Sequence, residues 1–148
     1  HQLREGRPCI LGGVEIPHSK GPLGHSDADV LLHAICDALL GAAGLKDIGT
    51  YFPDSSSEFK NADSRILLKK CAELIKEKGF RVGNIDSSLC LEEPKLKPHV
   101  DQMKKNISSD LAIDIDDVSV KATTNEKMGF IGRGEGLVAY AVVLLIKE

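Results

Sequence analysis

The sequence predicts an α+β fold, a two-layer sandwich with helices packed on one face of a mixed four-stranded sheet. Three segments place apolar residues at helical spacing, and several others alternate or run apolar as strands do. The predicted order is β-α-loop-α-β-α-β-β, with no internal repeat and no linker. Residues 1–148 are therefore predicted to form a single domain.

The first half of the chain predicts a pair of short strands and one long helix. Glycine and proline punctuate the segments between them, as they do in turns and loops. Ser26 or Asp27 is expected to cap the helix, and Gly44 to end it. The elements are, in order, two short strands within 8–17 that break at Gly12-Gly13, a loop over 18–27, a helix over 29–44 and a surface loop over 45–62.

The second half predicts two further helices and three strands. Gly79 ends a helical apolar pattern, and the strand that follows is interrupted around Gly83-Asn84. Pro94 and Pro98 bracket a tight connection into the last helix. The elements are a helix over 64–78, a strand over 80–93, a helix over 99–111, and strands over 116–124 and 135–148.

Composition excludes several classes of protein. A net charge of −3 and an aromatic content of 4% without Trp argue against a nucleic-acid partner. The longest apolar run, 137–146, is about half the length of a bilayer span, so no membrane partner is expected. The four cysteines have no CxxC spacing and are expected to be reduced and buried. Because the chain begins with His1 rather than Met, a few N-terminal residues are expected to be missing.

Histidines and carboxylates gather around the start of the first predicted helix. His25, Asp29 and His33 follow one another at four-residue intervals, and Asp47 and Asp54 lie downstream. A helix N-terminus favours phosphate, and a helical His is a common metal ligand. Each residue alone also fits a structural role, such as a first-turn carboxylate that complements the helix dipole. Together they indicate metal and phosphate chemistry, for which a zinc-dependent hydrolase is one interpretation.

Two later segments carry further polar groups. Thr123, Thr124 and Glu126 follow a predicted strand and precede a glycine-rich turn, an arrangement that suits phosphate and Mg²⁺. Lys95 lies on the rigid connection between two prolines. Either segment also fits an ordinary strand end or loop.

Over essentially its whole length the sequence resembles the 2-C-methyl-D-erythritol 2,4-cyclodiphosphate synthase family. The resemblance rests on HSDADVLLHAICDALLGAAGLKDIG-x-x-FPD, on PK-x-x-PH and on KATT-x-E-K-x-GF-x-GRGEG. It implies a phosphorus–oxygen lyase of the non-mevalonate isoprenoid pathway, favoured to lie in the bacterial cytoplasm over a plastid-type organelle. Its substrate would be 4-diphosphocytidyl-2-C-methyl-D-erythritol 2-phosphate, and its products the cyclic diphosphate and CMP.

The resemblance also implies metal ions and catalytic residues. His1 and His33 would bind Zn²⁺ with an Asp two residues before His1, outside this chain. Glu126 would bind a second divalent ion, Mg²⁺ or Mn²⁺, on the nucleotide diphosphate. His25 would position a phosphate, and Thr124 would assist the transition state.

The resemblance further implies residues that bind substrate and other ligands in a homotrimer with active sites between subunits. The Asp that would precede His1 is missing from this chain, and Tyr140 stands at a position that is acidic in some members of the family. These two departures leave an alternative interpretation, a catalytically weak module that binds a nucleotide or an isoprenoid diphosphate. The implied substrate-binding residues are His1, His25 and Ser26; Asp47, Ile48, Gly49, Phe52, Asp54 and Ser56 for the methylerythritol; Leu91, Pro94, Lys95 and Leu96 for cytidine; Thr123, Thr124 and Glu126 for the phosphates; and Phe130 and Arg133 for an isoprenoid diphosphate in an axial cavity.

Overall fold

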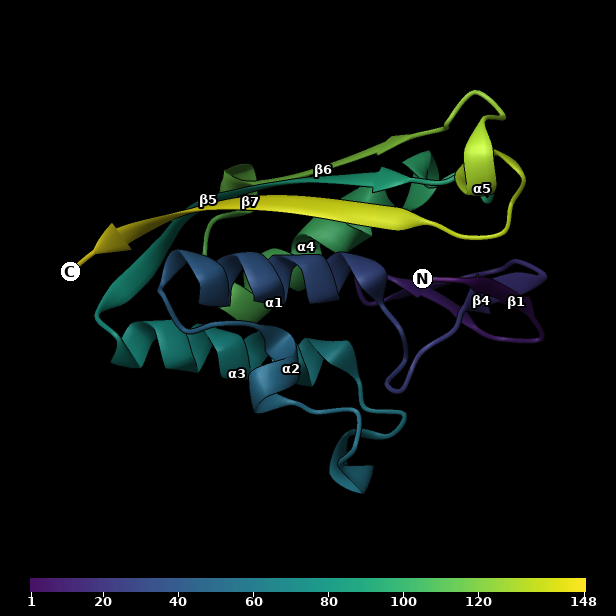
Figure 1. Cartoon of the computed structure of the whole chain (residues 1–148). Coiled ribbons are helices and arrows are strands. Elements are labelled where there is room, and N and C mark those ends of the chain that lie inside the picture. The colour runs from purple at the N-terminus through teal and green to yellow at the C-terminus, as the bar shows by residue number, and fades with distance from the viewer.

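The computed structural model describes all 148 residues and contains one main sheet with helices on one face (Figure 1). The sheet has the strand order β6-β5-β7. Its strands are β5 (Phe80–Cys90), β6 (Val118–Thr123) and β7 (Val138–Lys147). β6 runs parallel and β7 antiparallel to β5, so the predicted mixed sheet is confirmed. The prediction of four strands is wrong, because this sheet has three.

The missing strand lies in the N-terminal segment, which forms two small sheets of its own. The antiparallel pairs are β1 (Leu3–Glu5) with β4 (Lys20–Pro22), and β2 (Cys9–Leu11) with β3 (Val14–Ile16). Gly12 and Gly13 have φ of +61° and +73°, the left-handed conformation that a two-residue hairpin turn requires. The predicted break at these glycines is therefore confirmed. β1 and β4 were not predicted, since strands of three residues show no alternation.

Three long helices cover one face of the main sheet, as predicted. They are α1 (Val30–Ala42), α3 (Ser64–Glu77) and α4 (Val100–Leu111). α1 packs on β7 and α4 on β6, whereas α3 packs mainly against α1 and α4 (Figure 1). The predicted loop regions contain short helices: α2 (Ile48–Tyr51), η1 (Ser57–Phe59), η2 (Lys97–His99), η3 (Ile115–Asp117) and α5 (Gly129–Gly132).

The start of α1 differs from the expectation, because neither Ser26 nor Asp27 caps it. The N-cap is Asp29, whose carboxylate accepts a hydrogen bond from the backbone N–H of Leu32 at 3.1 Å. The same carboxylate accepts from the N–H of Gly12 at 3.0 Å and of Gly13 at 2.8 Å. Asp29 is fully buried and so ties the β2–β3 hairpin to the helix.

We predict that Asp29 makes the stability of the protein depend on pH. Burial raises the pKa of Asp29 from 3.8 to about 7, against the opposing effect of the three N–H donors. The folded-state pKa of Asp29 lies above its unfolded value. The contribution of Asp29 to the free energy of unfolding is therefore complete below pH 3.8 and is lost as pH rises through about 7.

Urea unfolding at pH 5 and pH 8 measures this effect, with Asp29→Asn as the comparison. The wild type is expected to lose more free energy of unfolding than the variant over this interval, because asparagine does not titrate. An equal loss in both proteins would contradict the assignment.

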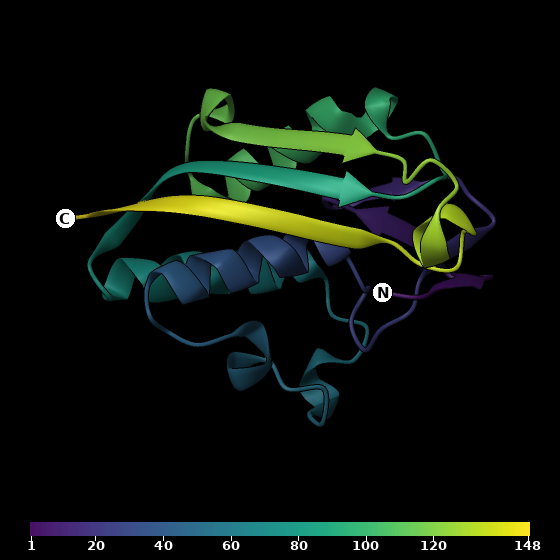
Figure 2. The same cartoon turned by 45° about the horizontal axis from the view of Figure 1, so that its top comes forward.

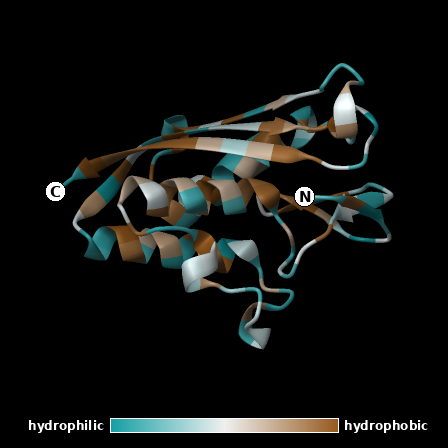
Figure 3. Cartoon of the chain, in the orientation of Figure 1, coloured by the Kyte–Doolittle hydropathy of each residue, from teal (hydrophilic) through white to brown (hydrophobic).

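The other face of the main sheet has no helix on it. Four apolar side chains of β7 point outward there: Tyr140, Val142, Leu144 and Ile146. Figure 2 turns this face toward the viewer, with α4 behind the sheet and α1 below β7, and Figure 3 shows hydrophobic colouring along much of β7. The predicted interruption of β5 is confirmed as a register shift between Val82 and Asn84.

The four cysteines are free, as predicted, and three of them are buried. No helix has the length and apolar composition needed to span a bilayer.

Candidate active site

A pocket of about 280 Å³ forms between the start of α1 and the segment that carries α2 and η1. It brings together residues from both ends of the HSDADVLLHAICDALLGAAGLKDIG-x-x-FPD motif. Of the predicted site residues, its lining includes His25, Ser26, His33, Ile48, Gly49, Phe52 and Asp54. Pro53, Phe59 and Leu67 complete the wall. The structure thus gathers residues that sequence spacing alone could not place together.

A hydrogen-bond network fixes the polar side of this pocket. His25 Nε2 lies 2.9 Å from the carbonyl oxygen of Ser56, which ties the loop before α1 to the loop before η1. His33 Nε2 lies 3.1 Å from Ser26 Oγ and 2.9 Å from Ser64 Oγ. Two histidines and a serine hydroxyl therefore face one small pocket.

The chemistry of His1 and His33 fits a metal ion. Their ring centroids are 5.6 Å apart, although His1 is 32 positions earlier in the chain. Burial lowers the pKa of His33 below its usual value, which keeps the ring neutral as metal binding requires. No group of three or more His, Cys, Asp or Glu side chains is close enough to hold an ion. The chain therefore offers two neighbouring imidazoles here, fewer than the three side chains that a metal site usually needs.

Two residues expected at the alcohol-binding loop lie outside the pocket lining. Asp47 caps α2, and its carboxylate accepts from the Thr50 hydroxyl at 2.7 Å and the Thr50 N–H at 3.0 Å. These hydrogen bonds lower the pKa of Asp47. Ser56 takes part through its backbone carbonyl, the acceptor of the His25 contact. Their side chains are thus engaged in the loop or at its surface.

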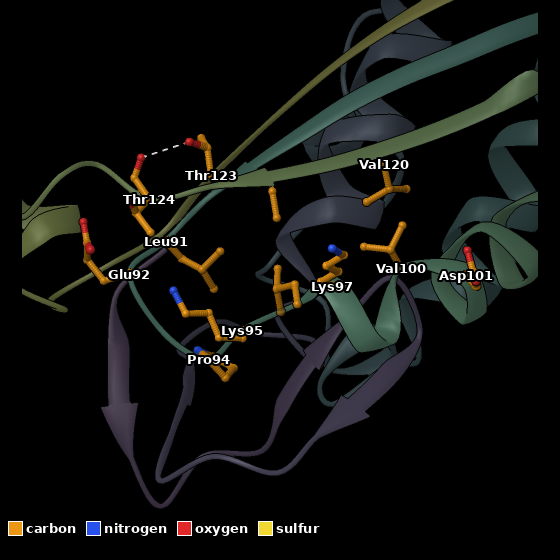
Figure 4. A pocket seen from close by; sticks show the side chains of 12 residues that line it. Leu91, Glu92, Pro94, Lys95, Lys97, Val100, Asp101, Val120, Thr123 and Thr124 are labelled. Carbon is orange, nitrogen blue, oxygen red and sulfur yellow. Dashed lines mark hydrogen bonds between the residues drawn. The ribbon is translucent and has the colours of Figure 1, made fainter.

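A second pocket, of about 540 Å³, lies where β5 and β6 end above η2 and α4 (Figure 4). It combines an apolar floor with lysines and threonine hydroxyls. Six predicted site residues line it: Leu91, Pro94, Lys95, Leu96, Thr123 and Thr124. Glu92, Lys97, Val100, Asp101, Val120 and Ala122 complete it. Because β5 and β6 are parallel, their C-terminal ends meet, and this brings the motifs around Lys95 and Thr124 together.

The turn after Thr124 is held in an unusual backbone conformation. Glu126 and Lys127 have φ of +51° and +62°, which side-chain-bearing residues rarely adopt. Glu92 Oε1 accepts from the N–H of Asn125 at 2.8 Å and of Lys127 at 3.1 Å. The Glu126 carboxylate itself makes no hydrogen bond and lies outside both pockets.

The residues expected at an axial cavity do not line a single pocket in one chain, although the pockets of Phe130 and Arg133 adjoin at Lys20 and Gly134. Phe130 lines a pocket of about 680 Å³ with His1 and the residues that precede β7. Arg133 lines another, of about 560 Å³, and forms an ion pair with Glu135 at 2.7 Å. Tyr140 is exposed on the open face of the sheet. One copy of the chain thus does not assemble them into a single cavity.

Sequence reasoning missed three polar residues of this region. Ser64 and Asp27 contact one another and Ser64 contacts His33, while Glu92 holds the turn that carries Glu126. Ser64 is 38 positions after Ser26, so no local pattern joins the two. The only signal for Glu92 was its place beside the PK-x-x-PH motif.

Comparison with known proteins identifies this arrangement. The model of the YgbB family matches residues 1–146, nearly the whole chain. The chain belongs to the YgbB family. A relative from Bacteroides thetaiotaomicron is 60% identical over 100% of this chain and 93% of its own length. One from Burkholderia cenocepacia is 58% identical over 100% and 92%. Both are named 2-C-methyl-D-erythritol 2,4-cyclodiphosphate synthase.

Several solved structures share the fold of this YgbB chain. A cyclodiphosphate synthase in a form bound to CDP has a TM-score of 0.90 and 36% identity, covering 99% of this chain and 95% of that one. A CDP complex from Plasmodium falciparum has a TM-score of 0.84 and 38% identity, covering 100% and 89%. The bifunctional IspDF of Campylobacter jejuni has a TM-score of 0.94 and 46% identity; this chain spans 40% of it.

Proposed function

We propose that this YgbB chain performs the reaction for which its relatives are named. It is a lyase that converts 4-diphosphocytidyl-2-C-methyl-D-erythritol 2-phosphate into 2-C-methyl-D-erythritol 2,4-cyclodiphosphate and CMP, in isoprenoid biosynthesis. An oxygen of the 2-phosphate attacks the β-phosphorus, and the bond from that phosphorus to the oxygen of CMP breaks. The bacterial relatives favour the bacterial cytoplasm as its location.

The observation that carries the proposal is the division of the site between two pockets. The pocket with His25 and His33 and the pocket with Lys95 and Thr124 share no lining residue. The substrate carries a cytidine diphosphate and a phosphorylated alcohol, one for each pocket. A complete site then requires that one pocket of a subunit meets the other pocket of its neighbour.

A homotrimer meets this requirement, because a head-to-tail contact that closes into a ring repeats the same junction between subunits. The uncovered face of the main sheet supports such an assembly. Val142 is 72% exposed and Leu144 59% exposed on that face in the single chain. Contiguous apolar surface of this kind is typical of an interface. An isoprenoid diphosphate is the ligand we propose for the axial cavity that three copies would enclose, near Phe130 and Arg133.

Each pocket contributes groups that suit polyanionic reactants. Lys95 and the backbone around Leu91 and Leu96 suit the cytidine nucleotide, while Ser26 and His25 suit the 2-phosphate. The Thr124 hydroxyl has no acceptor in the structure, so its proton is available to an oxygen of the β-phosphate as charge develops there. The substrate brings its own nucleophile, and the protein therefore needs no attacking side chain.

Divalent ions would complete the proposed active site. His1 and His33 would hold Zn²⁺, and Glu126 would hold Mg²⁺ or Mn²⁺ on the nucleotide diphosphate. Bound cations of this kind supply positive charge that neutralises and orients phosphate oxygens. The paired imidazoles and the unengaged Glu126 carboxylate support the proposal.

Phosphorus NMR of the purified protein with substrate, Zn²⁺ and Mg²⁺ tests the reaction. Equal amounts of CMP and cyclic diphosphate are expected. CMP with linear phosphate products would indicate a hydrolase, and substrate that binds but stays unchanged would indicate a binding module. Either result would overturn the proposed function.

We predict that Val142→Asp prevents the trimer from forming. The substitution would bury a carboxylate in each interface, where an unpaired charge is costly. Sedimentation velocity is expected to show a monomer with no cyclodiphosphate synthase activity. Ile66→Asp is the matched control, because Ile66 is a half-exposed apolar residue of α3, on the helical side. A Val142→Asp trimer with full activity would contradict the interface.

A further inference from the structure

His33 is held by two residues that the proposed reaction has not used. Its Nε2 atom lies 2.9 Å from Ser64 Oγ, and Ser64 Oγ in turn makes a short hydrogen bond to Asp27 Oδ1. Asp27 Oδ2 also accepts from the Ser64 N–H at 3.0 Å. Ser64 is fully buried at the first position of α3, whose N-cap is Asp63. The three side chains thus form one connected chain, Asp27–Ser64–His33.

The number of protons in this chain determines the state of the imidazole. A carboxylate only accepts hydrogen bonds, so the single Ser64 hydroxyl proton points to Asp27. Ser64 Oγ can then meet His33 Nε2 only as an acceptor. His33 must therefore carry its proton on Nε2 and donate it to Ser64.

The other ring nitrogen is left free by this arrangement. His33 Nδ1 has no hydrogen-bond partner. Every buried side-chain nitrogen or oxygen in the protein does have one, so Nδ1 is not buried. Nδ1 is therefore open to the adjoining space rather than sealed in the core. In the Nε2–H form this atom bears an unshared electron pair, which is what a metal ligand needs.

We propose that Asp27 and Ser64 are positioning residues, which fix His33 as the Nε2–H tautomer and so present Nδ1 to the metal ion. This rests on the proposed function, because that function supplies the metal. Groups that orient a ligating histidine in this way raise its basicity and lock its ring. They also join the starts of α1 and α3, so the ligand is anchored to two helices.

The same arrangement assigns a role to Ser26. Its Oγ accepts from the Ala28 N–H at 3.2 Å and lies 3.1 Å from His33 Nε2, whose single proton is directed to Ser64. A protonated Nε2 cannot accept a hydrogen bond, so the Ser26 hydroxyl proton is free to donate into the pocket. A phosphate oxygen is the acceptor expected there.

Nitrogen-15 NMR of the metal-free protein tests the tautomer directly. The five histidines give ring signals, and the signals missing from His33→Gln belong to His33. At neutral pH we expect a protonated Nε2 and an unprotonated Nδ1 in the wild type, and a mixture of tautomers in Ser64→Ala. A wild-type proton on Nδ1, or an unchanged spectrum in Ser64→Ala, would overturn the proposal.

Zinc affinity, measured by competition with a chelator, provides a second readout. Ser64→Ala is expected to bind zinc roughly 10- to 100-fold more weakly than the wild type. Asp27→Asn should also weaken zinc binding, since an amide group can donate to Ser64 Oγ and so reverse the direction of the Ser64 hydroxyl. Ser64→Thr keeps the hydroxyl and should bind zinc like the wild type. Ser87→Ala is the matched control: it also removes a buried hydroxyl, one bonded to the Ser119 carbonyl at 2.8 Å, and should bind zinc normally.

The two measurements separate this proposal from the proposed function. If the wild type binds no zinc, the metal site fails, but the tautomer in the metal-free protein still decides whether Asp27 and Ser64 position His33. If the wild type binds zinc and Ser64→Ala binds it equally well, the positioning role fails while the metal site stands.

Discussion

Replacement of His33 by alanine is expected to abolish zinc retention and cyclodiphosphate formation together. The variant removes the imidazole that lies against His1 and leaves His1 as the one proposed ligand from this chain. Because the proposed ion would neutralise charge between two polyanionic groups, its loss should slow the reaction by about a thousandfold or more. Metal analysis of the purified protein and a phosphorus NMR assay measure the two effects.

The control for this prediction is His99→Ala. His99 is the N-cap residue of α4 but makes no capping hydrogen bond through its side chain, and it lines neither pocket. Its zinc content should match that of the wild type. Full zinc occupancy in His33→Ala would remove His33 from the ligand set.

The second large effect is expected from Thr124→Val, which keeps the shape of the side chain and removes its hydroxyl. Loss of one positioned donor to a developing charge raises a barrier by about 3 kcal/mol, or roughly a hundredfold in rate. We expect kcat to fall while KM changes little, because the hydroxyl acts mainly on the transition state. Steady-state assays of CMP release measure both constants.

Thr123→Val is the matched control for Thr124→Val. The Thr123 hydroxyl donates to the Thr124 carbonyl oxygen at 3.2 Å, a contact drawn in Figure 4, so it is already engaged within the protein. The substitution should therefore reduce kcat much less. If the two variants lose activity equally, the specific role of Thr124 is wrong.

Much of the fold could be predicted because its long elements carry strong periodic patterns. The helices at 29–44, 64–78 and 99–111 and the strand with its break at Gly83-Asn84 all agree with the structure within a few residues. The cap of α1 could not be predicted from spacing, because Asp29 is selected by a contact with the distant hairpin. The same holds for β1 and β4, whose pairing depends on tertiary packing.

The candidate site shows a similar limit. Motif order placed His25 and His33 at the start of one helix, and the structure brings them into one pocket with residues of the 48–54 segment. The roles of Ser64 and Glu92 depend on hydrogen bonds between residues more than 30 positions apart, and a local sequence pattern does not reveal such contacts. The placement of Phe130 and Arg133 in two adjoining pockets likewise appears only in three dimensions.

The central claim is that each active site combines the His25 pocket of one subunit with the Thr124 pocket of another. Co-expression of His25→Ala with Thr124→Val, under different affinity tags, yields mixed trimers that test it. In a ring of three, every mixed trimer contains one junction at which both pockets are intact, so about one third of its sites should be active. Mixed trimers purified through both tags are predicted to have about one third of the wild-type activity, whereas activity no higher than that of the separate variants would contradict the account.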